Sequence, residues 1–315
     1  MEKIFLDLFN KIQKSVLECD SSNIALSGGL DSSIIAYFLK EKKPKCIAII
    51  AEDFIASDLT YCQLIAKELS IPLSIKNVKT DELLDAIEQT IKILKNFNDI
   101  EIRNSVVMYL AIKYIKEQGK KSIVTGDGAD ELFAGYNFFL NKSPEELEKE
   151  QKRIWKTMHF PSHEIGEHLG IKVESPYLSE DVMNFAKTIP VELKVQKNES
   201  VTYGKWILRK IFEDKIPKKI AWRQKSAMQD GSGTSGLTEL FESVISDEAF
   251  DAKKEEISKT DDVVLRTKES MHYYEIYRKF FKLSKNSSVE HSCPFCKSPV
   301  MEDSKFCRMC GAYPI

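Results

Sequence analysis

The chain has 315 residues, a hydrophobic content of 43% and a formal net charge of −2 at pH 7. This length allows two structural units, and the hydrophobic content is ordinary for a globular protein. A charge so close to zero argues against bulk electrostatic attraction to nucleic acid or to a membrane surface. The sequence has no apolar run of 18 residues, so we expect no membrane span.

The first half of the chain alternates apolar and amphipathic segments. Residues 1–17 mix charged and apolar side chains as an amphipathic helix does, and not as a signal peptide does. Four apolar runs typical of strands follow, at 23–27, 46–50, 73–77 and 121–125. Helical stretches lie between and after them, at 31–41, 58–69, 81–96 and 102–118. This order predicts an α/β fold, in which a parallel sheet carries helices on both faces.

The second half becomes more charged and is expected to be mainly helical. Residues 142–153 are interpreted as an exposed helix or a mobile loop. Residues 229–236 are rich in glycine and are predicted to form a loop, either plainly flexible or ordered by ligand binding.

The turn after the first predicted strand reads Ser27-Gly28-Gly29-Leu30-Asp31-Ser32-Ser33. The two glycines let the backbone approach an anion closely, and the free amide groups at the following helix start point at negative charge. Asp31 would repel phosphate, unless it holds Mg2+ that bridges to the phosphate oxygens. The segment therefore predicts a phosphate-binding loop that uses Mg2+.

A second glycine turn follows the last predicted strand and reads Thr125-Gly126-Asp127-Gly128-Ala129-Asp130-Glu131. Three carboxylates on one turn repel each other, so a simple surface turn gains nothing from them. Because both turns leave the carboxyl ends of parallel strands, they should meet in the ligand crevice of the sheet. There, two carboxylates and phosphate oxygens would form an ordinary Mg2+ site.

The first motif resembles the PP-loop of ATP pyrophosphatases. The segment TGDGADELFAGY resembles the signature of the synthetase domain of asparagine synthetase B and its relatives, including β-lactam synthetases. Further similarity at 102–110, 206–210, 216–225 and 267–277 extends the resemblance over a predicted domain of residues 1–283. It implies a ligase that adenylates a carboxylate, releases pyrophosphate and forms an amide with ammonia or an amine.

The resemblance also implies roles for individual residues. Asp127 would help to form the acyl-adenylate, at a position that is Glu in many asparagine synthetases, and Lys225 would steady the developing charge. Arg103 would read a substrate carboxylate, or form a surface salt bridge instead. Asp31 and Asp130 would hold Mg2+. The ATP contacts would come from Leu26, Ser27, Gly28, Gly29, Asp31, Ser32, Ile49, Thr125 and Gly126.

Two segments depart from the family pattern. Glu174 stands near an expected Arg, and residues 158–163 lack the usual Arg and Asp. Both regions lie near the substrate in relatives, so ATP chemistry is a firmer expectation than aspartate as the substrate. Full asparagine synthetases also carry an N-terminal glutaminase with a cysteine nucleophile, whereas Glu2 follows Met1 here. We therefore expect the nitrogen to come from free ammonia, from a separate glutaminase partner or from an amine within the substrate.

The tail contains two C-x2-C pairs, Cys293/Cys296 and Cys307/Cys310. Four thiolates at this spacing fit a structural, tetrahedral Zn2+ site. We predict a zinc ribbon over 292–315 after a polar linker at 284–291, with a protein or a nucleic acid as its partner. Its few basic residues make nucleic acid the weaker choice. Seven cysteines, four of them in this pattern, indicate a reducing cytosol.

Asparagine synthesis from aspartate and ammonia is the leading hypothesis. Amide or lactam synthesis on another carboxylate is the first alternative, because of the altered substrate segments. A PP-loop enzyme that modifies tRNA is the second, although the GDGADE signature argues against it. A non-catalytic adenylate sensor is the third, and the retention of Asp31, Asp127, Asp130 and Lys225 argues against that.

Overall fold

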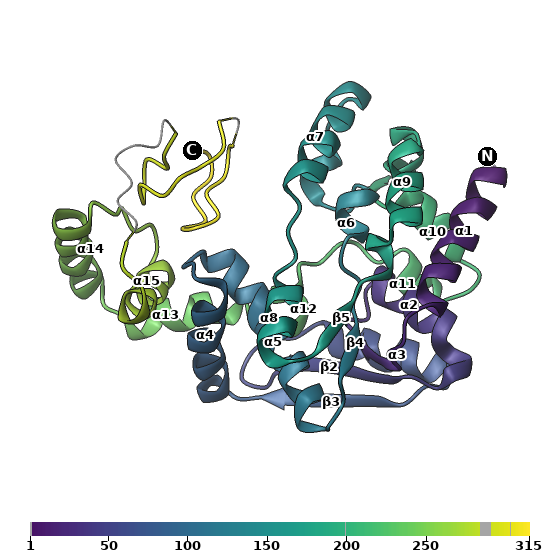
Figure 1. Cartoon of the computed structure of the whole chain (residues 1–315), viewed down its shortest axis with the longest axis horizontal. Helices are drawn as coiled ribbons and strands as arrows, with labels where there is room; N and C mark the ends of the chain where they lie inside the picture. The colour runs from purple at the N-terminus through teal and green to yellow at the C-terminus, as the bar shows by residue number, and fades with distance from the viewer. Residues whose placement is uncertain (1, 199, 284–290, 303) are drawn as a thin grey trace.

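Five short parallel strands form the central sheet of the computed structural model, which describes residues 2–198, 200–283, 291–302 and 304–315 (Figure 1). Their order across the sheet is β3 (Leu73–Val78), β2 (Lys45–Ala51), β1 (Asn23–Ala25), β4 (Ser122–Val124) and β5 (Lys172–Glu174). β1 lies in the middle, where Ile24 pairs with Cys46 of β2 and with Val124 of β4. The parallel sheet predicted from the sequence is confirmed.

Helices cover both faces, so the sheet separates two hydrophobic cores. Along β2, Cys46 and Ala48 belong to one core while Ile47 and Ile49 belong to the other. This alternation explains why β2 reads as a continuous apolar run, because both of its faces are buried. The first core includes α1 (Glu2–Leu17), α2 (Leu30–Leu39), α3 (Asp58–Glu68), α9 (Glu180–Thr188) and α10 (Trp206–Phe212). The second includes α4 (Thr80–Leu94), α5 (Asp99–Glu117), α8 (Pro161–Leu169), α13 (Gly236–Val244) and α15 (Lys268–Phe280).

Strands and helices predicted in the first half agree with the structure to within a few residues. In the second half, the helix alternative for 142–153 is confirmed as α7 (Pro144–Thr157), which begins with a capping box between Ser143 and Glu146. The prediction of a mainly helical second half was incomplete, because this half also contains β5 and the hairpin of β6 (Gln196–Asn198) and β7 (Val201–Tyr203). The predicted loop at 229–236 was wrong in part, since α12 (Met228–Ser232) occupies its first half.

The C-terminal cysteine-rich segment packs against the second core (Figure 1). The amide of Phe97 donates to the carbonyl of Met309 at 2.9 Å, and the amide of Val264 donates to Phe295 at 2.7 Å. Of the linker predicted over 284–291, only His291 belongs to the described residues. Within the described ranges, none of the helices combines the length and the apolar character needed to cross a bilayer.

Candidate active site

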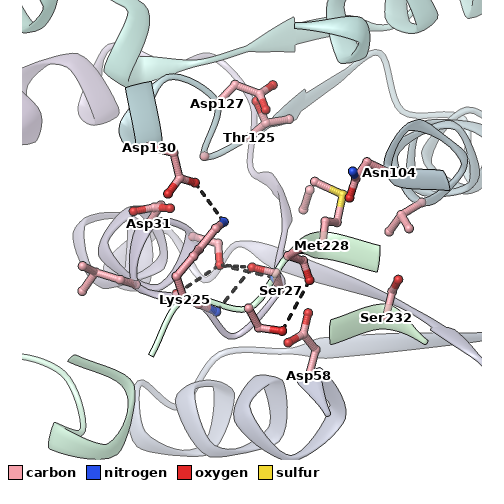
Figure 2. Close-up of a pocket in the computed structure, with 18 of the residues that line it drawn as sticks. Ser27, Asp31, Asp58, Asn104, Thr125, Asp127, Asp130, Lys225, Met228 and Ser232 are labelled. Atoms are coloured by element: carbon pink, nitrogen blue, oxygen red, sulfur yellow. Dashed lines mark hydrogen bonds and ion pairs between the residues drawn. The ribbon is translucent and has the colours of Figure 1, made fainter. Parts of the chain in front are cut away.

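A cavity of about 510 Å3 opens where β1, β2 and β4 end, and both glycine motifs line it (Figure 2). All of the residues predicted for catalysis, ATP or Mg2+ border this cavity except Gly28 and Arg103. Leu26 and Ile49 contribute apolar surface from the ends of two neighbouring strands. The cavity is therefore at the carboxyl edge of the sheet, which is the position expected for the ligand crevice from the sequence.

The turn around Gly28 leaves no room for a side chain. Gly28 has a φ of +65°, and a Cβ atom there would lie 2.6 Å from the backbone nitrogen of Cys62. Only glycine takes this conformation without strain. α2 starts directly afterwards, and the Ser27 and Ser32 hydroxyls lie 3.2 Å apart at its N-terminus. Hydroxyl and amide donors thus gather at one end of the cavity, as a phosphate group requires.

Asp31 and Asp130 are brought together by a lysine that the sequence analysis missed. The ammonium of Lys205 lies 2.6 Å from a carboxylate oxygen of each, and Lys225 reaches Asp130 at 2.9 Å. Figure 2 shows Lys225 extending toward Asp130, beside Asp31. Gly135 is packed against the same group, because a Cβ there would lie 1.9 Å from Asp130 and 2.2 Å from Lys205.

The two carboxylates respond differently to this burial. Burial raises the pKa of Asp31, and the ammonium of Lys205 only partly opposes it. Burial acts in the same sense on Asp130, but Lys205 and Lys225 outweigh it and hold the pKa of Asp130 well below its usual range. The remaining oxygen of Asp31 is buried and accepts no hydrogen bond from the described residues. Two hard carboxylates, one with an orphaned oxygen, fit a Mg2+ ion.

Asp127 also lines the cavity, where two hydroxyl groups orient it. Its Oδ2 accepts hydrogen bonds from Thr125 at 2.7 Å and from Ser162 at 2.5 Å. Glu131 also borders the cavity, and burial, followed by the charge of Asp130, raises its pKa to about 7. The hydroxyl of Tyr136 donates to Glu131.

Arg103 lies outside the cavity lining. Its guanidinium pairs with Glu269 at 3.3 Å and donates to the hydroxyl of Thr238. Glu269 is only 2% exposed, so this is a buried ion pair between α5 and α15. The structure thus places Arg103 in a salt bridge, the alternative to substrate recognition, although not in a surface one.

The family model described as asparagine synthase matches residues 21–159 and 147–263, which is well over half of the chain. The chain belongs to the asparagine synthase family.

Family relatives include glutamine-hydrolyzing asparagine synthetases of Gallus gallus, 29% identical, and Arabidopsis thaliana, 28% identical; each alignment covers 86% of this chain. A probable asparagine synthetase of Dictyostelium discoideum is 31% identical over 82% of it. The chain spans about half the length of these relatives, 50% to 51%. Among solved structures, the NH3-dependent NAD synthetase of Campylobacter jejuni is 14% identical, covers 54% of this chain and 92% of its own, and has a TM-score of 0.31, too low to support an argument.

The two segments that depart from the asparagine synthase pattern occupy different places. His159, Phe160 and Pro161 line the cavity, whereas Glu174 does not. Glu174 instead accepts hydrogen bonds from the amides of Asp20 and Ser21, and so fixes the entry to β1. Only residues 159–161 therefore bear on the cavity.

Arg223 is a further residue that the sequence analysis did not single out for the site. It lines the cavity, pairs with Asp58 at 2.8 Å and lies 3.8 Å over the ring of Tyr61. Its position two residues before Lys225, in a segment similar to the family, was a signal that could have found it. The sequence signal for Lys205 was weaker: this lysine stands directly before Trp206, where another segment similar to the family begins.

The four tail cysteines form a second, separate cluster. Their sulfur atoms all lie within 4.8 Å of one another, and all four side chains are buried. Two of the separations are 3.7 Å, between Cys293 and Cys310, and 3.6 Å, between Cys296 and Cys307. Sulfurs bound to one tetrahedral Zn2+ at about 2.3 Å would lie about 3.8 Å apart. The donor set therefore fits zinc.

Proposed function

We propose that this protein is an ATP-dependent ligase that adenylates a carboxylate and joins it to ammonia or an amine, with aspartate and ammonia as the first substrates to test. One observation carries the proposal. Asp31, Asp130, Lys205 and Lys225 converge beside a glycine turn of the phosphate-binding type, and Asp127 faces the same cavity.

In the first step a carboxylate oxygen of the substrate attacks the α-phosphorus of ATP, and the bond from that phosphorus to pyrophosphate breaks. Ser27, Gly28, Gly29 and Ser32 would hold the phosphates, while Leu26, Ile49, Thr125 and Gly126 would line the nucleoside site. Mg2+ bound by Asp31 and Asp130 would neutralise charge on the phosphate oxygens. Lys225, with Lys205 beside it, would balance the charge that builds on the leaving pyrophosphate.

In the second step the nitrogen attacks the acyl carbon, and the bond between that carbon and the AMP oxygen breaks. The nitrogen must lose a proton as the amide forms. Asp127 is the carboxylate best placed to accept it, because two hydroxyls orient it toward the cavity without neutralising it.

Amide or lactam synthesis on another carboxylate is the second candidate. Arg103 is engaged by Glu269, and the substrate wall presents His159, Phe160 and Pro161. Contacts with Glu101, at 3.6 Å, and Glu164, at 2.5 Å, raise the pKa of His159. Because the positive charge of His159 is already paired with these two glutamates, this part of the cavity leaves little free positive charge for a second carboxylate, such as that of aspartate.

The zinc assignment and the cellular setting are also proposals. We infer one structural Zn2+ held by Cys293, Cys296, Cys307 and Cys310, because four buried thiolates leave no open position for catalysis. All seven cysteines are free, which agrees with a reducing, cytoplasmic setting.

The test is pyrophosphate release from ATP and Mg2+, with aspartate, ammonium and glutamine added singly and together. We expect release that requires aspartate, and asparagine when ammonium is present. Lys225→Met should lower the rate about 100-fold or more, while Lys219→Met, an exposed lysine nearby, should not change it. Release that requires a different carboxylate would favour the second candidate, and no release with any carboxylate would overturn the proposal.

A further inference from the structure

A continuous line of hydrogen bonds leads from Asp127 out of the cavity. Thr125 donates to Oδ2 of Asp127 at 2.7 Å, and its hydroxyl oxygen lies 2.9 Å from that of Ser175. The Ser175 hydroxyl in turn lies 2.9 Å from Nε2 of His163. Four side chains from three segments are therefore joined without a gap.

The sheet register places the two hydroxyls opposite each other. Val124 of β4 pairs with Glu174 of β5, so Thr125 and Ser175 leave adjacent strands at the same level. The amide of Thr125 donates to the carbonyl of Glu174 at 2.9 Å and fixes that separation. The link between the hydroxyls is thus set by backbone structure.

The line joins two different cavities. Asp127 borders the 510 Å3 cavity of the active site. His163 is exposed and lies on a shallow second cavity of about 350 Å3, which Glu18, Glu174 and Ser175 also line. Thr125, between them, is only 2% exposed. A proton on Asp127 therefore has a route to solvent that does not cross the substrate cavity.

We propose that Thr125, Ser175 and His163 carry to solvent the proton that Asp127 takes from the attacking nitrogen. This inference rests on the proposed function, because amide formation is the step that releases the proton. His163 acts through Asp127 and does not touch the substrate, so it is a positioning and relay residue.

The polarity of the line follows from its chemistry. An ionised Asp127 only accepts, so Thr125 donates to it, Ser175 donates to Thr125, and Nε2–H of His163 donates to Ser175. Once Asp127 is protonated it becomes a donor, both hydroxyls turn, and His163 presents an unprotonated Nε2 in its other tautomer. Each hydroxyl then passes on one proton as it receives one. Nε2 accepts the last, and the exposed imidazole releases one proton to water, which restores the starting state.

Acidic side chains surround His163. Glu164 follows it on α8, Glu174 lies on β5 and Glu18 follows α1. Lys172 partly offsets them, since it pairs with Glu174 at 3.0 Å. His168, exposed on the same helix, makes no hydrogen bond or ion pair with Asp127 in the described part of the chain and provides a matched control.

The first arm of the test needs no substrate. We expect the nitrogen NMR shifts of the neutral form of wild-type His163 to show a ring protonated mainly at Nε2. Thr125→Val does not touch His163, yet it should move these shifts by several ppm toward a tautomer mixture, and leave His168 unchanged. If the nitrogen NMR shifts of His163 were the same in Thr125→Val as in wild type, the relay would be overturned, whatever the activity of the variant.

The second arm separates the two chemical steps, with ATP, aspartate and ammonium as the probes. His163→Gln can still donate to Ser175 but cannot release a proton, so amide formation should fall about tenfold while adenylate formation is retained. Added imidazole should restore part of the rate, and His168→Gln should match wild type. Unchanged amide formation in His163→Gln would overturn the relay. If wild type does not turn over aspartate, that substrate assignment fails, and the NMR arm alone decides the relay.

Discussion

Lys205 holds together the two carboxylates on which the proposed site depends. Its ammonium is buried between Asp31 and Asp130, with the side chain only 4% exposed. Lys205→Met would leave two buried carboxylates next to each other, so we expect it to lower the free energy of unfolding by about 3 kcal/mol. Urea denaturation of the metal-free protein measures this. Lys210→Met breaks a partly exposed pair with Glu213 and should cost less than about 1 kcal/mol. Equal losses in the two variants would contradict the prediction.

Lys194 is a buried lysine with no carboxylate partner among the described residues. It is 1% exposed, its ammonium donates to Gln151 at 3.2 Å, and burial lowers its pKa to about 7. The unfolded chain, with a lysine pKa of about 10.4, binds more protons between these values. The free energy of unfolding should therefore rise from pH 7 to pH 10. Below pH 7 the free-energy cost of burying a charged lysine is fully present.

The variant Lys194→Met isolates this contribution. The wild-type slope of unfolding free energy against pH should exceed that of the variant by up to about 1.4 kcal/mol per pH unit in this window. Chemical denaturation at several pH values provides the slopes. Lys187→Met, on the exposed part of α9, should keep the wild-type slope. Parallel curves for wild type and Lys194→Met would show that Lys194 stays charged when folded.

At the scale of elements, α6 (Ala129–Leu132) carries Asp130 and Glu131 but has only four residues. Side chains of α7 donate hydrogen bonds to the backbone of α6. The indole of Trp155 donates to the carbonyl of Glu131 at 3.0 Å, and Gln151 donates to that of Leu132 at 3.3 Å. A helix this short depends on such contacts, because it cannot satisfy its own last carbonyl groups.

Trp155→Phe removes the indole donor and keeps most of the ring. We expect a loss of about 1 kcal/mol in stability and a several-fold slower release of pyrophosphate, because Asp130 and Glu131 lose a fixed backbone. Trp222→Phe also deletes an indole hydrogen bond, to Glu213 at 3.1 Å, but leaves α6 alone. If both variants lost stability and activity in the same proportion, α7 would have no special part in placing α6.

Elements with a strong local signal were predictable from the sequence. β2 is a long apolar run, and each glycine motif contains its own strand end, turn and helix start. β5 could not be found in this way, because Lys172-Val173-Glu174 is short and mostly polar, and its pairing with β4 makes it a strand. α7 was left between two alternatives, since its charged surface fits either one.

The same distinction holds within the site. Asp31, Asp127 and Asp130 stand in recognisable motifs, and the structure brings them to one cavity. Lys205 lies 174 residues from Asp31 along the chain, so no local pattern shows that they touch. The link from Thr125 to His163 depends on strand register in the same way. Arg103 stands in a segment similar to the family and was a candidate for substrate recognition. Its pairing with Glu269, on a helix far away in sequence, could not be seen from that segment.

At the scale of the whole molecule, the cysteine-rich tail contacts the chain next to three helices, of which α5 borders the cavity. Arg266, ahead of α15, donates to the carbonyl of Cys310 at 2.9 Å, and Phe97, ahead of α5, donates to Met309. Arg308 donates to the carbonyl of Thr157 at the end of α7. That carbonyl lies two residues before His159, the first of the cavity-lining residues 159–161. The tail thus contacts the chain just ahead of this part of the cavity.

Loss of the metal should therefore be felt beyond the tail. We expect about one Zn2+ per chain by elemental analysis, because four thiolates complete one tetrahedral site. Cys296→Ser should lower the zinc content and the hydrogen-exchange protection of 95–101, 262–270 and 291–315, since a segment this small has little core of its own. The central strands should keep their protection. Cys19→Ser, outside the cluster, should retain the metal. A zinc-free protein with full protection at 95–101 would show that the cysteine cluster does not stabilise the start of α5.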